Sequence, residues 1–547
     1  MSEQLIEQAT AWRDADPDPV TRAELDRLIA AGDTAELAVR FAGRLTFGTA
    51  GLRGPLGAGP TRMNRVLVRT TAAAVADVLI ARGEADRPIA IAYDARHNSD
   101  VFAVDTARVA AARGIDVVLL TGTQPTPVLA RAVRHHGGGA GVMVTASHNP
   151  PADNGYKVYW GDGAQIVPPT DVEISEAMDR IGLVGDDDLA PEDDPRITRI
   201  GDEAVEEYLA TISRLAPDAP GDLRVVYSAM HGVGSEAVRR AFAVAGLTAP
   251  IVVPEQDAPD PDFPTVSFPN PEEPGAMDLL LALAEAEGAE LAIANDPDAD
   301  RLAAAVPSRE GGWRVLTGNE VGWLLADHVL EHTEGDDRFV ATSIVSSRLL
   351  DRLAEAHGVR SARTFTGFKW IVRPAIEDPG LRFVFGYEEA LGYLVGDAVL
   401  DKDGVSAAVA MTELVAGLRA DGRTVEDRLD DLARRFGVHA TDGWSVRFEG
   451  PDGSVRMAEL MDRYRSAPPT TLAGRPVDEV RDLAAEEPPT DGVMFTAGDV
   501  RLTIRPSGTE PKMKLYCEVV EPIDEDLAAA RARAVTTLAA VRADVGD

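Results

Sequence analysis

The chain has 547 residues, of which 45% are hydrophobic, and this length is enough for three or four domains with cores of their own. Its 54 basic and 90 acidic residues give a net charge of −36, which argues against nucleic acid and anionic membrane surfaces as partners. No run of about 18 apolar residues could span a bilayer, and the acidic start lacks the apolar core of a signal peptide. With a single cysteine, the composition predicts a cytoplasmic protein without disulfide bonds.

In chain order, residues 1–40 are predicted to form a helical extension. The segment FGTAGLRG (47–54) follows and has three closely spaced glycines. It lacks the Lys-Ser/Thr pair of a nucleotide-binding P-loop, and no such motif occurs elsewhere, which argues against an ATP-dependent kinase. Arg53 within this segment could reach a phosphate group.

The central part of the chain repeats one pattern of strand, helix, strand and a later third strand. Short apolar runs that alternate with amphipathic helices predict sheets of mainly parallel strands covered by helices. We therefore predict three similar mixed-sheet α/β domains in series. Their expected strands lie at 88–94, 115–122 and 141–147, at 223–230, 250–256 and 289–296, and at 338–347, 360–367 and 381–389, with helices at 100–113, 235–246 and 348–358.

The last part of the chain has a different pattern. Paired runs such as DVRLTIRP and KMKLYCEVVE indicate antiparallel strands, and a helix with acidic residues at its start is expected over 524–545. This is typical of an α+β domain, and the four domains are expected to surround one central cleft. The predicted boundaries are 41–205, 206–312, 313–438 and 439–547.

Ligands bind at the carboxyl ends of strands in sheets of this kind. In each repeat the third strand ends in a different polar cluster: Ser147-His148-Asn149, then the run from Asp296 to Asp300, then Glu388-Glu389. Equivalent positions thus carry three different chemistries, and we expect them to form one functional site.

The segment DPDADR places Asp296, Asp298 and Asp300 at alternating positions after a strand. Three carboxylates so spaced can converge on a hard cation and leave positions open for a phosphate oxygen, which suits Mg²⁺. An EF-hand is excluded because its sixth and twelfth positions hold Arg301 and Pro307. We expect this loop to be exposed at the cleft. A solvated acidic turn, or a phosphatase with Asp296 as nucleophile, are the alternatives.

Ser147 lies at a strand end near the predicted metal site and could carry a phosphoryl group. An α/β-hydrolase nucleophile would need glycines two residues away on both sides, which this serine lacks. The segment RPSGTEPKMK (505–514) combines Arg505 with small residues and hydroxyls, a composition typical of a phosphate-binding nest.

Only five of the 54 basic residues are lysines. A lysine in such an arginine-rich background is a candidate for a task that needs a compact ammonium group or an adjustable pKa. The five are Lys157, Lys369, Lys402, Lys512 and Lys514.

Four motifs, TASHNP, DPDADR, GYEEALGY and RPSGTEPK, resemble in order and spacing those of the α-D-phosphohexomutase superfamily over roughly residues 40–520. The segments FGTAGLRG, SAMHGVG and PNPEEPGAM further resemble its longer branch, which includes phosphoglucomutase-like and phosphopentomutase-like enzymes. The resemblance implies a phospho-sugar mutase that interconverts hexose 1-phosphate and 6-phosphate. Ser147 would exchange its phosphoryl group with the sugar, and a catalytic sugar bisphosphate such as glucose 1,6-bisphosphate would act as activator.

The resemblance also assigns roles to residues. Mg²⁺ would be held by Asp296, Asp298, Asp300 and the phosphate on Ser147, and Arg53, His148 and Lys157 stand at the acid/base and transition-state positions. The substrate and its second phosphate would be contacted by Arg301, Thr366, Gly367, Phe368, Lys369, Glu388 and Glu389, and by Arg505, Ser507, Gly508 and Thr509.

Two departures from the family pattern leave questions open. Many members have a serine where this chain has Ala390, and many have a histidine where this chain has LVGDAVLDKDG (394–404), so the acid/base group on that side is left open. Without the serine we expect relaxed specificity, with glucose phosphates preferred over mannose and pentose phosphates. A phosphatase and a non-enzymatic sugar-phosphate sensor are the alternatives from other classes, and the sequence carries no signal for an oligomeric state.

Overall fold

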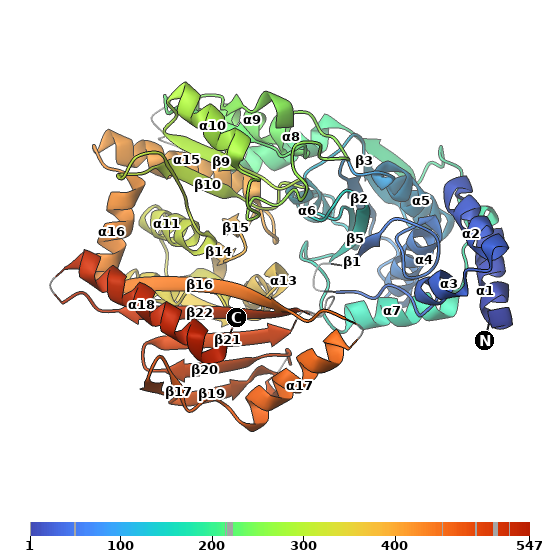
Figure 1. Cartoon of the computed structure of the whole chain (residues 1–547). Coiled ribbons are helices and arrows are strands. Elements are labelled where there is room, and N and C mark those ends of the chain that lie inside the picture. The colour runs from blue at the N-terminus through green and yellow to red at the C-terminus, as the bar shows by residue number, and fades with distance from the viewer. Residues whose placement is uncertain are drawn as a thin grey trace.

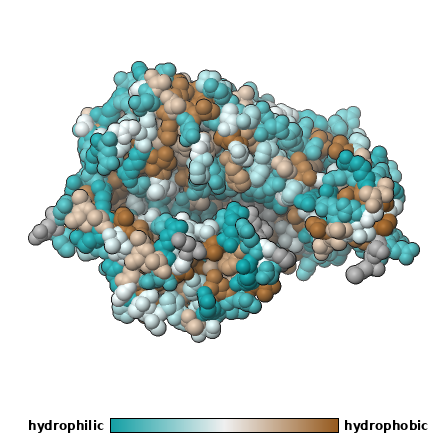
Figure 2. All heavy atoms as spheres, in the orientation of Figure 1, coloured by the Kyte–Doolittle hydropathy of each residue, from teal (hydrophilic) through white to brown (hydrophobic). Residues whose placement is uncertain are grey.

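The computed structural model describes residues 2–48, 51–213, 215, 222–450, 452–486, 489–506, 512–524 and 526–546. The strands form four large sheets and one small hairpin. The N-terminal helices lie at one end of the molecule, and the fourth sheet lies beside the third with the C-terminal helix across it (Figure 1). Figure 2 shows that the surface is hollowed between the fourth sheet and the elements of the second.

Three helices precede the first sheet: α1 (Ser2–Ala15), α2 (Pro19–Ala31) and α3 (Thr34–Arg40). The start of α2 follows from its sequence, because the carboxylate of Asp18 accepts a hydrogen bond from the N–H of Val20 and Pro19 tolerates the first turn. Gly32, at φ 62°, ends the helix in the left-handed conformation. Ala9, Leu25 and Leu37 form a small core of their own with Ala58.

The first sheet has six strands in the order β1-β5-β4-β2-β3-β6. Strands β4, β2 and β3 pair in parallel, whereas β5 pairs antiparallel with β4, and β1 pairs antiparallel with β5. The elements are β1 (Leu52–Pro55), α4 (Arg65–Ala81), β2 (Ile89–Tyr93), α5 (Ser99–Ala112), β3 (Val117–Leu120), α6 (Thr126–His135), β4 (Ala140–Val144), β5 (Asp153–Trp160), α7 (Thr170–Ile181) and β6 (Ile197–Ile200).

The second sheet has the order β11-β10-β9-β7-β8 and the third has the order β13-β12-β14-β15. The second contains β7 (Val225–Ser228), β8 (Ile251–Val252), β9 (Leu291–Ala294), β10 (Ala303–Pro307) and β11 (Trp313–Val315), with helices α8 (Asp202–Ile212), α9 (Gly234–Val244) and α10 (Asp278–Glu287). The third contains β12 (Arg338–Ser343), β13 (Arg360–Thr364), β14 (Arg382–Glu388) and β15 (Gly392–Val395), with α11 (Gly318–Glu331), α12 (Leu349–Ala356), α13 (Phe368–Ile371), α14 (Arg373–Glu377), α15 (Gly404–Ala420) and α16 (Val425–Phe436).

The predicted threefold repeat is confirmed, because the three sheets share one strand order. In each, the third predicted strand pairs in parallel with the first, which pairs in parallel with the second. The prediction missed one antiparallel strand that follows the third in every repeat, namely β5, β10 and β15. Polar and turn-forming residues such as Asp153, Asn154 and Gly155 conceal β5 from an apolar pattern.

The fourth sheet is antiparallel throughout, in the order β16-β22-β21-β20-β19, as predicted for this part of the chain. Its elements are β16 (Val438–Arg447), α17 (Gly453–Ser466), β19 (Glu479–Asp482), β20 (Val493–Ala497), β21 (Val500–Pro506), β22 (Lys512–Glu521) and α18 (Leu527–Val545), and β17 (Thr471–Leu472) pairs with β18 (Arg475–Pro476). It has a separate apolar core.

One continuous apolar core joins the second and third sheets and extends to the first, through residues such as Ala92, Leu129 and Met143. Helix α15 packs against elements of both and is buried along most of its length. Each fully buried Val or Leu there contributes about 1.5–3 kcal/mol, so the two sheets are held as one unit. Among the residues that the structure describes, no helix is long and apolar enough to cross a membrane.

Candidate active site

Ser147 follows β4 after a short turn and has a left-handed backbone, at φ 52°. Its N–H donates to Oγ1 of Thr145 at 2.8 Å. Its Oγ donates to Oδ2 of Asp296 at 2.8 Å and lies 3.0 Å from Nδ1 of His148. A non-glycine residue in this conformation is strained, and such strain is concentrated at functional sites. The structure thus joins the serine of the first repeat to the carboxylates of the second.

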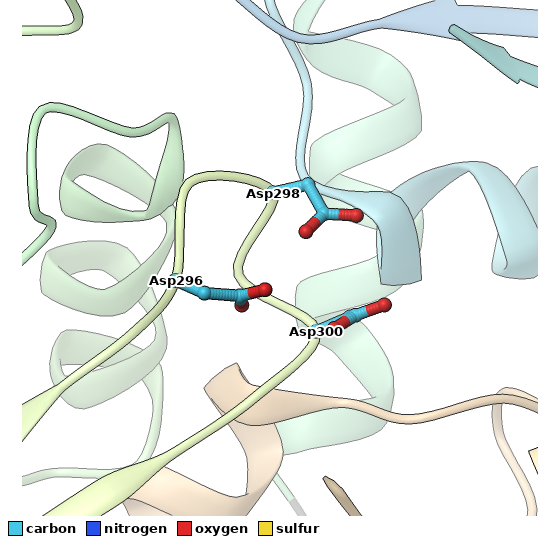
Figure 3. A group of neighbouring side chains, drawn as sticks. All are labelled: Asp296, Asp298 and Asp300. Atoms are coloured by element: carbon cyan, nitrogen blue, oxygen red, sulfur yellow. The ribbon is translucent and has the colours of Figure 1, made fainter. Parts of the chain in front are cut away.

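The three aspartates of DPDADR lie on the loop between β9 and β10, and Figure 3 shows their side chains around one common space. Their ligand atoms lie within 4.8 Å of one another. The expectation that this loop is exposed is wrong, since Asp296, Asp298 and Asp300 are all fully buried. Residues from other elements cover it: the hydroxyl of Thr126 at the start of α6 donates to Oδ2 of Asp298 at 2.6 Å.

The donor set fits a divalent cation. Oδ1 of Asp298 and Oδ1 of Asp300 are buried and accept no hydrogen bond from the residues that the structure describes. Burial and the two neighbouring carboxylates raise the pKa of Asp296, so this member of the triad resists ionisation unless positive charge is added. Carboxylate oxygens at this spacing are the ligands that hard cations such as Mg²⁺ prefer.

Two lysines contact the triad. Nζ of Lys157, on β5, lies 2.7 Å from Oδ2 of Asp298 and 2.8 Å from Oδ2 of Asp300. Nζ of Lys402 lies 2.6 Å from the same oxygen of Asp300. Burial lowers the pKa of Lys157, but Asp298 and Asp300 outweigh burial and raise it above the ordinary value. Lys157 is therefore a positive charge at the site.

Lys402 is a site residue to which the sequence assigned no role, although its rarity made it a candidate. Buried carboxylates flank it on both sides in the chain. Asp401 accepts from the hydroxyl of Tyr159 at 2.6 Å and from the amide of Gln165 at 2.7 Å, both in the first repeat. Asp403 accepts from the hydroxyl of Tyr208, on α8, at 2.7 Å. Hydrogen bonds from two other parts of the chain thus fix the segment that presents Lys402.

The other predicted acid/base groups lie around Ser147. Nη1 of Arg53, on β1, donates to Oδ1 of Asn149 at 3.0 Å. Burial, together with the charges of Arg301 and Arg53, lowers the pKa of His148 well below the ordinary value, so this imidazole is neutral at pH 7. The backbone N–H of Arg301 donates to Oδ1 of Asp296 at 3.0 Å, and its guanidinium pairs with Glu272 at 3.3 Å.

The predicted sugar contacts lie at the carboxyl end of β14. Oε1 of Glu388 accepts from the N–H of Gly367 at 2.6 Å. Burial and the neighbouring Glu389 raise the pKa of Glu388. Oε2 of Glu389 accepts from the hydroxyl of Ser346 at 2.8 Å and from Ser343 at 3.1 Å.

The remaining predicted contacts lie on α13 and on β21. Phe368 packs in the apolar core, and Lys369 beside it is also buried, with a pKa lowered by burial. Arg505 at the end of β21 donates to the hydroxyl of Thr366, which brings the fourth sheet to the third. The predicted phosphate-binding residues Ser507, Gly508 and Thr509 lie outside the described residues.

The segment SAMHGVG packs directly against the aspartate loop. The N–H of Val233 donates to the carbonyl of Pro297 at 2.8 Å. A Cβ on Gly232 would lie only 2.3 Å from Cα of Pro297, so only glycine fits there. The two glycines that follow β7 could have indicated a close approach of another backbone, but the sequence does not show which loop approaches them.

Four successive family models match the chain: phosphoglucomutase/phosphomannomutase α/β/α domain I (residues 44–184), domain II (206–311), domain III (317–436) and the C-terminal domain (455–535). A repeated α/β fold with a serine against buried aspartates is that of an enzyme that moves a phosphoryl group within a sugar. The chain belongs to the phosphoglucomutase/phosphomannomutase family of the α-D-phosphohexomutase superfamily, and it is an isomerase of the intramolecular phosphotransferase type.

Curated relatives carry names for several sugars. A "Probable phosphomannomutase" of Haemophilus influenzae is 44% identical over 85% of this chain and 95% of its own. The phosphopentomutase of Mus musculus is 34% identical over 95% and 91%, and a phosphoglucomutase of Staphylococcus epidermidis is 35% identical over 86% and 90%. Among solved structures, a family protein from Burkholderia thailandensis has 20% identity and a TM-score of 0.68 over 91% of this chain and 97% of its own, which supports the fold.

Proposed function

We propose that this enzyme interconverts hexose 1-phosphates and 6-phosphates, with glucose phosphates preferred, through a phosphorylated Ser147. The observation that carries the mechanism is the 2.8 Å contact between Oγ of Ser147 and Oδ2 of Asp296. It places the only serine of the strand-end clusters against the carboxylates that can hold a cation. Mannose and pentose phosphates are the alternative substrates within the same chemistry.

In the forward half-reaction, the bond between phosphorus and Oγ of Ser147 breaks while a bond from phosphorus to a sugar hydroxyl oxygen forms. The sugar hydroxyl loses its proton to a base, and Oγ of Ser147 regains one. The sugar bisphosphate then returns its other phosphoryl group to Ser147 in the reverse sense. A catalytic amount of sugar bisphosphate, such as glucose 1,6-bisphosphate, would phosphorylate an enzyme that has lost its phosphate.

Mg²⁺ held by Asp296, Asp298, Asp300 and the Ser147 phosphate would neutralise charge on the phosphoryl oxygens. The support for this assignment is the pair of buried, unpartnered oxygens on Asp298 and Asp300. The chain's own cations surround the same space, which concentrates positive charge where the phosphoryl group would be transferred.

For the proton transfers, the candidates are the groups around Ser147 and the triad. His148 is supported by its 3.0 Å distance to Oγ of Ser147, and Arg53 by its contact with the adjacent Asn149. Lys157 and Lys402 both contact Asp300. The raised pKa of Lys157 suits this group to stabilising the charge of the transition state, which leaves Lys402 as the lysine candidate for proton transfer. We assign Lys402 to the side that the family's histidine would occupy.

The distal part of the substrate would be held by groups of the third and fourth sheets. Glu388 and Glu389 offer acceptors to sugar hydroxyls, and Arg301 and Lys369 offer positive charge. Arg505, which contacts Thr366, would grip the phosphate that is not reacting, together with Ser507, Gly508 and Thr509, whereas Thr366, Gly367 and Phe368 would contact the sugar.

A coupled assay across glucose, mannose and pentose 1-phosphates, with a catalytic amount of glucose 1,6-bisphosphate, tests the function. We expect isomerisation without release of inorganic phosphate, since the reaction conserves organic phosphate. Intact mass should show one phosphate on the wild type and none on Ser147→Ala, which should lose most turnover. Steady release of inorganic phosphate, or full turnover by Ser147→Ala, would contradict the proposal.

A further inference from the structure

Arg96 lies in the loop that follows β2, within the segment DARHNS, and only 4% of its surface is exposed. Its guanidinium donates to four backbone carbonyls of the loop that carries Ser147. Nη2 contacts the carbonyl of Ser147 at 2.6 Å and that of Asn149, and Nη1 contacts the carbonyls of Pro150 at 2.8 Å and Asp153 at 3.1 Å. A single side chain therefore donates to four of the seven backbone carbonyls of residues 147–153, which we call the serine loop.

The serine loop depends on such a partner. Ser147 has a positive φ of 52°. This conformation costs roughly 1–3 kcal/mol and persists only where surrounding contacts enforce it. Buried carbonyls without donors would cost about 1–3 kcal/mol each, so the unsupported loop would rearrange. The planar guanidinium offers its donors in a fixed fork, which a lysine cannot reproduce.

Groups from two parts of the chain hold Arg96 in turn. Oδ1 of Asp94 accepts from the N–H of Arg96 at 3.0 Å and from the hydroxyl of Ser99 at 2.7 Å. On its other face the guanidinium lies 4.9 Å from the ring centroid of Phe263, in the second repeat. Phe263 itself has a positive φ of 45°. The arginine is therefore fixed against both the first and the second repeat.

Arg96 also lies behind the aspartate loop. It lines one small hollow with Asp94, His231, Gly232, Phe263 and Pro297. Pro297 stands between two of the three aspartates, and Gly232 packs directly on it. Arg96 thus contacts the serine loop and also lies beside Pro297 of the aspartate loop.

We infer that Arg96 is a positioning residue for phosphoryl transfer, which sets the place of Ser147 Oγ relative to Asp296 without touching the substrate. The inference rests on the proposed function, because it assumes that Ser147 carries the phosphoryl group. Misplacing a reacting group by about 1 Å can cost roughly 10²-fold in rate, so the loss of this arginine should act on turnover.

Arg338 provides a matched control. It also donates to four backbone carbonyls, those of Leu330, Thr333, Gly335 and His357. It lies at the first residue of β12, whereas the groups proposed to bind the sugar lie at the carboxyl ends of the strands. Its replacement therefore removes the same kind of interaction away from the site.

The test compares Arg96→Lys with Arg338→Lys for kcat, KM and the rate at which glucose 1,6-bisphosphate phosphorylates Ser147, followed by mass. We expect Arg96→Lys to lower kcat and the phosphorylation rate by about 10- to 100-fold with KM within about twofold. Arg338→Lys should lower the thermal midpoint and leave kcat unchanged. Methylguanidinium should partly restore turnover to Arg96→Ala and give nothing to Arg338→Ala.

Phe263→Leu covers the case in which the Arg96 variants do not fold, since it removes the ring from the guanidinium and keeps an apolar side chain. It should lower kcat by a few fold, with KM unchanged. Equal kcat in wild type and Arg96→Lys, or in wild type and Phe263→Leu if only the latter folds, would overturn the inference alone. A wild type without phosphate on Ser147 and without mutase turnover would overturn the proposed function and the inference with it.

Discussion

Lys402 and Asp300 lie in different repeats and are joined by a 2.6 Å contact between Nζ and Oδ2. Asp300 also receives Lys157, so one carboxylate oxygen is shared by two ammonium groups from the first and third repeats. The second repeat supplies the aspartate, and the first and third repeats supply the two lysines that pair with it.

Tyr159→Phe should weaken the support of Lys402, because it removes one of the two donors to Oδ2 of Asp401. A hydrogen bond to a charged group contributes about 1.5–3 kcal/mol, and we expect kcat to fall by up to about tenfold. Tyr156→Phe is the matched control, since Tyr156 is equally buried on the same strand but bonds to Thr106. Equal kcat values for the two variants would refute the role of Tyr159.

Metal dependence should be visible without a kinetic assay. If the triad binds Mg²⁺, a hundredfold excess over Kd stabilises the wild type by about 2.7 kcal/mol, and the thermal midpoint rises. Asp298→Asn should lose this shift, and it should also destabilise the fold, because Asp298 is buried against Lys157. Chelation should abolish turnover, and Mg²⁺ should restore it. A variant with the full Mg²⁺-induced shift would exclude Asp298 as a ligand.

Lys157→Arg keeps the charge but replaces a compact ammonium by a larger planar group in a fully packed site. We expect kcat to fall by about 10²-fold, because the larger guanidinium would displace the carboxylates between which the ammonium group lies. Lys369→Arg is the control for replacing a buried ammonium by a guanidinium. Lys369 is the other buried lysine and, among the described residues, forms no ion pair with the triad. Its effect should fall mainly on KM. Wild-type kcat in Lys157→Arg would show that charge alone suffices at this position.

Acid should loosen the contact between the third and fourth sheets through Glu518. This buried carboxylate accepts from Ser347, His439 and Arg348. Burial raises its pKa, but Arg501 and His439 outweigh burial and hold the pKa well below the ordinary value. A depressed folded-state pKa stabilises the fold above the unfolded value of about 4.3, and the contribution is lost as the pH falls below it.

Urea unfolding at several pH values between 7 and 3 measures this effect. The free energy of unfolding of the wild type should fall below pH 5, whereas Glu518→Gln should start lower and show a flatter dependence. Identical slopes for the two proteins would assign the acid sensitivity to other groups.

Sugar choice should depend on Ala390, which follows the two glutamates at the end of β14. Without a hydroxyl there, a wrong epimer leaves no buried polar group unpaired. We expect glucose 1-phosphate to be preferred, with appreciable kcat/KM for mannose and pentose 1-phosphates, and narrower specificity in Ala390→Ser. Discrimination above about 10⁴-fold by the wild type would refute the relaxed site. Glu388→Gln should raise KM for every sugar.

The sequence was most informative where a side chain follows a strand directly. Ser147, the three aspartates and Glu388 could be placed at one sheet edge because alternating strands and helices determine which ends face a ligand. Strand β5 could not be predicted, because it begins with the polar, turn-forming residues Asp153, Asn154 and Gly155, and β10 and β15 could not, because they are short and begin with the weak strand formers alanine and glycine.

Contacts between the repeats also could not be predicted from the sequence. Nothing in the local pattern shows that Tyr159 donates a hydrogen bond to Asp401, or that Arg96 donates to four carbonyls of another loop. The prediction that the aspartate loop is exposed was wrong for the same reason, since Thr126 and Gly232 cover this loop from distant segments. Sequence reasoning identifies the chemistry at strand ends, and tertiary packing decides its surroundings.

The shared strand order of the three sheets shows one plan used three times, yet none of the copies could work alone. A fragment that ended after the first sheet would leave Lys157 without Asp298 and Asp300, and Tyr159 without Asp401. The charges of the site are therefore balanced only when all three sheets have folded together.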